Sequence, residues 1–192
     1  MGWYTGVGSR ETPEDVQLLQ KRMGAMFFEK GWILRSGGAG GSDESYQFGV
    51  MGARGIEGVG GFEIYIPWNG FNGLWSKMDT GFLIATQLKM YFRAQEIAQE
   101  LHPTWPNCSE SAKKLHTRNI FQVLGSDLES PSRFLTCWAK PKGKSEEVEG
   151  GTNTAVKLAI QHRIPIFNLY HDDVRERAEK AVYEHRLAQG FI

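Results

Sequence analysis

A short stretch near the N-terminus combines glycines, serines and an acid in a way that favours phosphate binding. It reads LRSGGAGGSD, residues 34–43, follows an apolar strand pattern and ends on an acid. Glycine lets the backbone approach a ligand closely, and the amides that open a following helix carry partial positive charge. The candidate ligand-binding residues of this loop are Ser36, Gly37, Gly38, Gly40 and Asp43. Asp43 has an alternative role, because an acid at this position can cap the helix that follows.

Two further loops have the same character. Residues 5–12 contribute Gly8, Ser9 and Arg10, and residues 150–154 contribute Gly150, Gly151, Thr152 and Thr154. Tight turns alone would explain the glycines of any single loop, whereas three such loops favour an anionic ligand. None of them matches GxGxxG, and GxxxxGK[ST] is absent from the sequence. Standard NAD oxidoreductases and P-loop NTPases are therefore disfavoured, and we expect no cofactor.

The loops must be positioned by alternating strands and helices. Apolar strand patterns lie at 2–8, 32–36, 62–67, 133–139 and 164–170, and helical periodicity occurs between them. This alternation predicts an α/β fold, a Rossmann-like three-layer sandwich with a mostly parallel five-stranded sheet. We expect one domain over residues 1–192, with a helical insert at about 81–125 and a long loop over 68–80.

In such a sheet, right-handed crossovers bring the carboxyl ends of the strands to one edge, where ligands bind. The three loops should meet there. Arg118 and Asn119 lie on the helix predicted for 109–125, and either they reach the ligand or they belong to a solvated basic face. Trp138 ends the fourth strand and is the candidate for stacking on a base, although it could equally cover a core edge.

Other chemistries have weaker support. The five histidines form no HxxxH or HExxH pair, so we expect no metal site. Cys108 could be a nucleophile, but a packed thiol fits better. Lysine plus arginine equals aspartate plus glutamate at 22 each, which disfavours nucleic acid as a partner. Neither a signal peptide nor an apolar run of membrane-spanning length is evident, so we expect a cytoplasmic protein without a membrane partner.

Three blocks resemble the SLOG superfamily of Rossmann-like nucleotide-binding proteins. They are YTGVGSRETP, GWILRSGGAGGSDESYQFG and GGTNTAVKLAIQHRIPIFNL, and together they cover about half of the chain. The first two are similar to the core of bacterial DNA-processing (DprA-like) proteins. The third resembles the PGGxGTxxE loop of Lonely-guy-type phosphoribohydrolases. The whole is most similar to small SLOG proteins of bacteriophages and bacteria, which would place it in a bacterial host cytoplasm.

The resemblance implies a homo-oligomer that binds a nucleotide or phosphorylated nucleoside, such as an ADP-ribose-like or cyclic nucleotide signal. Relatives also include N-glycosidic hydrolases and single-stranded DNA-binding modules, which are the two alternatives. The hydrolase motif is broken here, because Asn153 replaces a glycine and Lys157 stands where the catalytic glutamate belongs. If the protein is an enzyme, it should be a nucleotide N-glycoside hydrolase, with Asp43 or Glu44 supplying the missing carboxylate.

Overall fold

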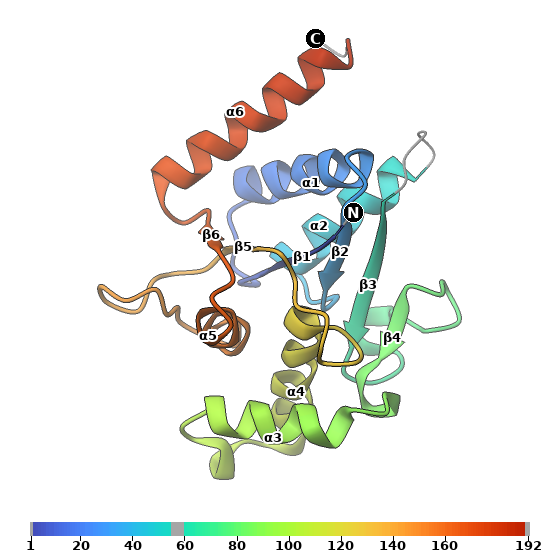
Figure 1. The fold of residues 1–192 in the computed structure, drawn as a ribbon, viewed down its shortest axis with the longest axis vertical. Helices are drawn as coiled ribbons and strands as arrows, with labels where there is room; N and C mark the ends of the chain where they lie inside the picture. Colours follow the sequence, from blue (N-terminus) through green and yellow to red (C-terminus); the bar gives the residue numbers. More distant parts are fainter. Residues whose placement is uncertain (1, 55–59, 191–192) are drawn as a thin grey trace.

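The computed structural model describes residues 2–54 and 60–190, and its centre is a parallel β-sheet (Figure 1). Within these residues the sheet has six strands in the order β4-β3-β2-β1-β5-β6, and every neighbouring pair is parallel. The strands are β1 (Trp3–Gly8), β2 (Ile33–Ser36), β3 (Gly61–Ile66), β4 (Phe82–Ile84), β5 (Leu135–Trp138) and β6 (Ile166–Asn168). The predicted α/β class and the parallel sheet are confirmed.

The predicted number of strands was wrong, because the sheet has six and not five. The additional strand is β4, which adds to the edge of the sheet by pairing Phe82 with Ile64 and Ile84 with Ile66 of β3. β4 lies in the segment predicted to be a helical insert, whereas the equally short β6 lies within the longer apolar pattern at 164–170. Only its pairing with β3 identifies β4.

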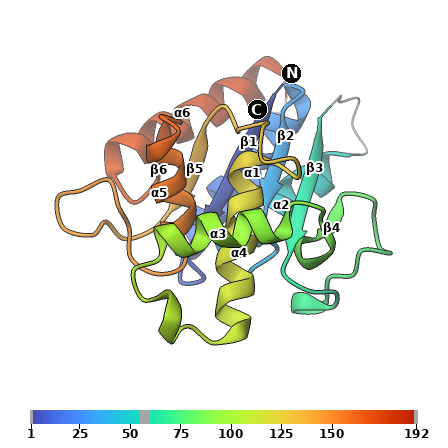
Figure 2. The same ribbon diagram turned by 60° about the horizontal axis from the view of Figure 1, so that its bottom comes forward.

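Helices cover both faces of the sheet. They are α1 (Glu14–Glu29), α2 (Ser42–Ala53), α3 (Tyr91–Leu101), α4 (Glu110–Leu124), α5 (Asn153–Gln161) and α6 (Asp172–Ala188). Figures 1 and 2 show α1, α2 and α6 on one side of the sheet and α3, α4 and α5 on the other. Each side has its own apolar core, with Tyr46 and Leu34 fully buried in the first and Phe121 and Val156 in the second.

The segment between β3 and β5 is more broken than its periodicity predicts. It contains three short 3₁₀ turns, η1 (Phe71–Gly73), η2 (Ala85–Gln87) and η3 (Trp105–Asn107). Within the predicted helical insert at about 81–125, α3 begins only at Tyr91, because Leu88 has extended backbone angles. The expected ends of α4 are confirmed: the Ser109 hydroxyl accepts from the Ala112 amide, and Gly125 closes the helix at a φ of 80°. The predicted insert therefore supplies an edge strand as well as two helices.

Helices α1 and α2 approach so closely that two glycines are required at their contact. A Cβ on Gly49 would overlap the carbonyl oxygen of Lys21, and one on Gly24 would lie 2.6 Å from the carbonyl oxygen of Tyr46. In both cases the obstacle is backbone, which cannot rotate away. The contact fixes α2, and therefore the loop before it, against the sheet.

Changing Gly49 to alanine is expected to lower the free energy of unfolding by about 2 kcal/mol, as overpacking does in tight cores. Gly52 lies on the same helix and has open space where its Cβ would be. Gly52→Ala should therefore raise stability by about 0.5 kcal/mol through helix propensity. Urea denaturation of both variants measures the difference. Equal values for the two would contradict the close helix contact.

The strand order places a crevice beside β1. Chain connections run outward from β1 through β2, β3 and β4 on one side, and through β5 and β6 on the other. This reversal leaves the carboxyl ends of β1 and β5 without a crossover covering them, which is where open α/β sheets bind ligands. Gly8 and Trp138 are paired at that point.

Candidate functional site

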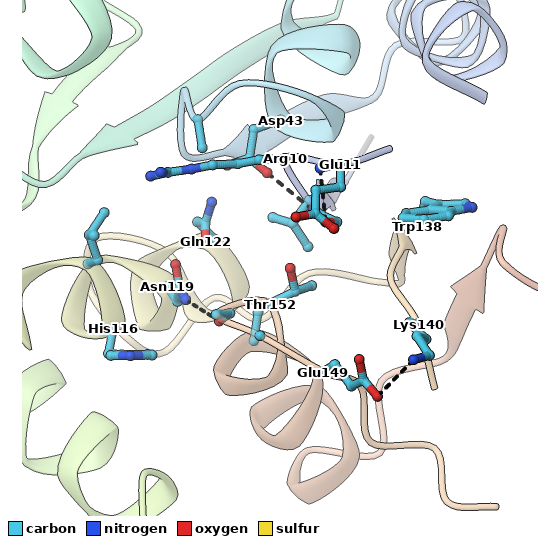
Figure 3. A pocket seen from close by; sticks show the side chains of 18 of the residues that line it. Arg10, Glu11, Asp43, His116, Asn119, Gln122, Trp138, Lys140, Glu149 and Thr152 are labelled. Atoms are coloured by element: carbon cyan, nitrogen blue, oxygen red, sulfur yellow. Dashed lines mark hydrogen bonds and ion pairs between the residues drawn. The ribbon is translucent and has the colours of Figure 1, made fainter. Parts of the chain in front are cut away.

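A cavity of about 560 Å³ opens at the carboxyl ends of β1 and β5 (Figure 3). Ten of the residues predicted to bind ligand line it, together with others from α4 and from the loop after β5. These ten are Gly8, Ser9, Arg10, Asp43, Arg118, Asn119, Trp138, Gly150, Gly151 and Thr152. The first and third glycine loops therefore form part of the cavity wall, and the second contributes through Ala39 and Asp43.

The first loop leaves β1 at Gly8, in a space that admits no side chain. A Cβ there would lie 2.6 Å from the Trp138 carbonyl oxygen and would overlap the Ser42 hydroxyl. The loop is held by backbone bonds on both sides: the Ser9 amide donates to Trp138 O at 2.9 Å, and the Ser42 amide donates to Ser9 O at 3.2 Å. The first turn of α2 is thereby attached to the end of β1.

Asp43 and Arg118 form a buried ion pair at the back of the cavity. Arg118 Nη1 donates to Asp43 Oδ2 at 3.2 Å, and both side chains are about 95% buried. The second carboxylate oxygen, Oδ1, accepts from the Gly8 amide at 3.2 Å. Asp43 is thus not the cap of α2; that position is held by Gly41. Burial raises the pKa of Asp43, although the charge and hydrogen bond of Arg118 and the amides of Ala39 and Gly8 oppose this effect.

Arg118 also joins a network along α4 that reaches the other two loops. With its amide oxygen toward Arg118, Gln122 accepts from Arg118 Nη1 and from the Gly37 amide, both at 2.8 Å. Its amide nitrogen then donates to Asn119 Oδ1 at 3.0 Å. Asn119 in turn donates to Gly151 O at 2.9 Å, a bond drawn in Figure 3. Side chains of α4 therefore bond to the second and third glycine loops, and Asp43 connects this network to the Gly8 amide of the first.

The second glycine loop serves the interior of the protein more than the cavity. The Ser36 hydroxyl is fully buried and donates to Gly6 O at 2.6 Å. A Cβ on Gly37 would overlap the Arg118 guanidinium, and one on Gly38 would overlap Leu74. Neither these three residues nor Gly40 lines the cavity. The small residues at 36–38 make room for protein side chains, foremost for Arg118.

Thr154 and Glu44 also lie off the cavity wall. The Thr154 hydroxyl is buried 2.8 Å from Nδ1 of His116, which does line the cavity. Burial, and then the charges of His102 and Arg118, lower the pKa of His116 to about 4. Glu44 is exposed on α2, so of the two proposed catalytic acids only Asp43 borders the cavity.

Comparisons of the chain with protein-family models, with curated proteins and with solved structures found no match. The SLOG resemblance therefore still rests on the three sequence blocks.

Lys157, which occupies the position of the missing glutamate, points away from the cavity: its Nζ donates to Leu101 O at 3.3 Å and lies 3.7 Å from Glu147. Within the described residues, no helix has the length and apolar character needed to cross a membrane.

Several cavity residues were not predicted from the sequence. They are Glu11, Ala39, Ala112, Leu115, His116, Gln122, Lys140, Glu149, Ala155 and Tyr170, with Val7 from the end of β1. A helical signal exists for five of the residues on α4, because Ala112, Leu115, His116, Asn119 and Gln122 follow each other at spacings of three and one. Such spacing places them on one face of the helix.

The charges of the cavity wall are partly paired. Lys140 lies 3.4 Å from Glu149 across the mouth, and Arg118 is committed to Asp43. Among the described residues no ion pair involves Arg10. Arg10 is exposed and borders the cavity, so it is the cation available to a ligand.

The tryptophans lie in different surroundings. Trp138 lines the cavity and its ring lies 5.6 Å from that of Tyr170, another lining residue. Trp68 and Trp105 instead pack on the two apolar cores. One wall of the cavity is therefore aromatic, while the opposite parts present amides, hydroxyls and Arg10.

Proposed function

We propose that the protein binds a nucleotide or a phosphorylated nucleoside in the cavity between β1 and β5. The observation that carries the proposal is the position of this cavity at the point where the strand order reverses, with the first and third glycine loops in its wall and Asp43 of the second bonded to Gly8 and to Arg118 of α4. Its volume falls within the range of about 300–1,000 Å³ that small-molecule sites occupy.

The chemistry of the wall fits the two ends of such a ligand. Gly150, Gly151 and Thr152 precede helix α5, whose N-terminus favours negative charge, and Arg10 supplies an exposed cation. Trp138 and Tyr170 offer an aromatic surface on which a base can stack. The phosphate and the base of a bound nucleotide would thus contact different parts of the cavity lining.

Binding is favoured over cleavage by the state of the one buried acid. Both oxygens of Asp43 already have partners, Arg118 and the Gly8 amide. A carboxylate committed in this way is poorly placed to stabilise a developing positive charge on a sugar. The other acids on the wall, Glu11 and Glu149, are exposed.

A nucleotide panel tests the proposal by thermal unfolding. A ligand present at 100 times its dissociation constant should stabilise the protein by about 2.7 kcal/mol, because it binds only the folded state. The panel should include nucleoside monophosphates, cyclic nucleotides, ADP-ribose and a single-stranded oligonucleotide. Release of the free base, detected by chromatography, would show hydrolysis instead. Strongly salt-dependent binding of the oligonucleotide alone would indicate a nucleic-acid-binding module.

Arg10→Gln is expected to weaken binding of the selected nucleotide about tenfold, since a charge-assisted hydrogen bond contributes roughly 1.5 kcal/mol. Arg22→Gln is the matched control, because Arg22 is an exposed arginine on α1 that does not line the cavity. Isothermal titration of both variants gives the comparison. Equal affinities in the two would exclude a ligand anion next to Arg10.

A further inference from the structure

Three side chains with metal-binding atoms meet beside α4, although they are scattered in the sequence. His102 follows the end of α3, Cys108 follows the turn η3, and His116 lies in the second turn of α4. One imidazole nitrogen of each histidine and the Cys108 sulfur lie within 4.8 Å of one another. All three residues are half-buried, so the group is shielded from solvent yet accessible to an ion.

The turn between α3 and α4 produces this arrangement. Two backbone hydrogen bonds fold residues 102–108 back on themselves. The Trp105 amide donates to His102 O at 3.1 Å, and the Cys108 amide donates to Trp105 O at 3.0 Å. Cys108 Sγ is thereby 3.7 Å from His102 Nδ1. The rings of His102 and His116 are 4.2 Å apart between centroids. The absence of a familiar histidine spacing therefore does not exclude a site built by tertiary structure.

These separations are close to those around a tetrahedral zinc ion. Zinc–sulfur and zinc–nitrogen bonds of about 2.3 and 2.0–2.1 Å imply a sulfur–nitrogen edge of about 3.6 Å and a nitrogen–nitrogen edge of about 3.4 Å. The observed Sγ to Nδ1 distance of 3.7 Å agrees with the first value. All the separations within the group are 4.8 Å or less, against about 3.4–3.6 Å around a bound tetrahedral ion.

The donor set selects the kind of metal. Two imidazoles and a thiolate suit a borderline-soft ion such as zinc, whereas calcium and magnesium require oxygen ligands. The Thr154 hydroxyl, 2.8 Å from His116 Nδ1, orients that ring and leaves Nε2 available to a metal. Hydrogen bonds of this kind support the histidine ligands of metal sites.

We propose that His102, Cys108 and His116 bind one zinc ion. The three protein ligands leave a fourth coordination position for water. His116, one of the three ligands, also borders the cavity. The inference stands without the proposed nucleotide function, since neither His102 nor Cys108 lines that cavity.

Competition titration of the full chain against a chromogenic zinc chelator tests the site. The natural chain, stripped of metal beforehand, is expected to take up one zinc ion per chain. Cys108→Ser and His102→Gln should each weaken binding by more than the roughly 10- to 100-fold that loss of an outer-sphere partner causes, and Thr154→Val by about tenfold. His162→Gln is the matched control, because His162 is an exposed histidine outside the cluster, and it should bind as the natural chain does.

Two measurements on the natural chain make the test independent of how well the variants fold. Cobalt(II) in this site should give visible d–d bands and a near-ultraviolet thiolate-to-cobalt band. Zinc should also protect Cys108 from iodoacetamide, whereas Cys137 is fully buried and its pKa is raised to about 12 by burial, so that it stays unreactive throughout. Zinc uptake that is unchanged in Cys108→Ser, or a cobalt complex without the thiolate band, would overturn the proposal.

Discussion

Replacing Arg118 by leucine is expected to lower the free energy of unfolding by about 3–5 kcal/mol, the usual loss when one partner of a buried ion pair is removed. The change removes the charged partner of the Asp43 carboxylate, which is about 95% buried in the natural chain, and leaves it with backbone amides as donors. It also removes a donor to Gln122 and so loosens the connection between α4 and the second glycine loop. Urea denaturation followed by fluorescence and circular dichroism measures the loss.

The pH dependence gives a second, sharper result for the same variant. Arg118 lowers the pKa of Asp43 against the effect of burial, so its removal should raise that pKa further above the ordinary value of 3.8. The folded variant then binds a proton more readily than the unfolded chain does, and its stability increases as the pH falls. Part of the loss measured at pH 7 should therefore be recovered on acidification toward pH 4, relative to the natural chain over the same range.

Two controls separate the ion pair from other effects of the substitution. Arg93→Leu removes an arginine from an exposed pair with Glu96 and should change stability by no more than about 0.5 kcal/mol. Asp43→Asn combined with Arg118→Leu should be less destabilised than the sum of the single changes, because each removes the same interaction. Strict additivity, or a loss that does not vary with pH, would show that the pair is not what stabilises this part of the protein.

The sequence pattern predicted the framework of the site because that framework is local. Two predicted strands, 2–8 and 32–36, run directly into loops of small residues, and parallel strands bring their ends to one edge. Gly8, Trp138 and Gly151 could therefore be expected at the cavity, and they line it. The edge strand β4 escaped prediction because it depends on pairing with β3 and carries no pattern of its own.

The contacts made by individual side chains could not be predicted from the sequence pattern, since they depend on residues far apart in the chain. Gly37 and Gly38 have the composition of a phosphate loop, yet the space beside them is taken by Arg118 and Leu74. The glycines in the sequence indicate that space is left beside the backbone, but they do not show whether a ligand or a protein side chain occupies it. The same limit applies to Cys108 and His116, which become neighbours of His102 only through the turn after α3.

Gly37→Ala is the second change from which we expect a large effect, a loss of about 3 kcal/mol, at the upper end of the range for overpacked cores. The new Cβ would overlap Nη1 of Arg118 and would lie too close to the Gln122 amide. The guanidinium cannot simply rotate away, because it is buried and its position is fixed by Asp43. Accommodating one methyl group therefore means breaking the ion pair.

Gly40→Ala is the matched substitution in the same loop. Its Cβ would meet no atom within 4 Å, and its backbone does not adopt a positive φ, so alanine should be tolerated there. Both changes reduce the freedom of the unfolded chain equally, and for Gly40→Ala that effect alone should give a gain of about 0.4–1 kcal/mol. The difference between the two variants thus isolates the space that the arginine occupies.

The decisive comparison places Gly37→Ala in the Arg118→Leu background. There the clashing guanidinium is gone, so the added methyl should cost far less than it does in the natural chain, with a coupling between the two sites of about 2 kcal/mol. This would establish that the glycine at position 37 exists to admit an arginine from α4. The same penalty in both backgrounds would instead place the requirement in the loop itself, and a direct role of Gly37 beside a ligand phosphate would again be the better explanation.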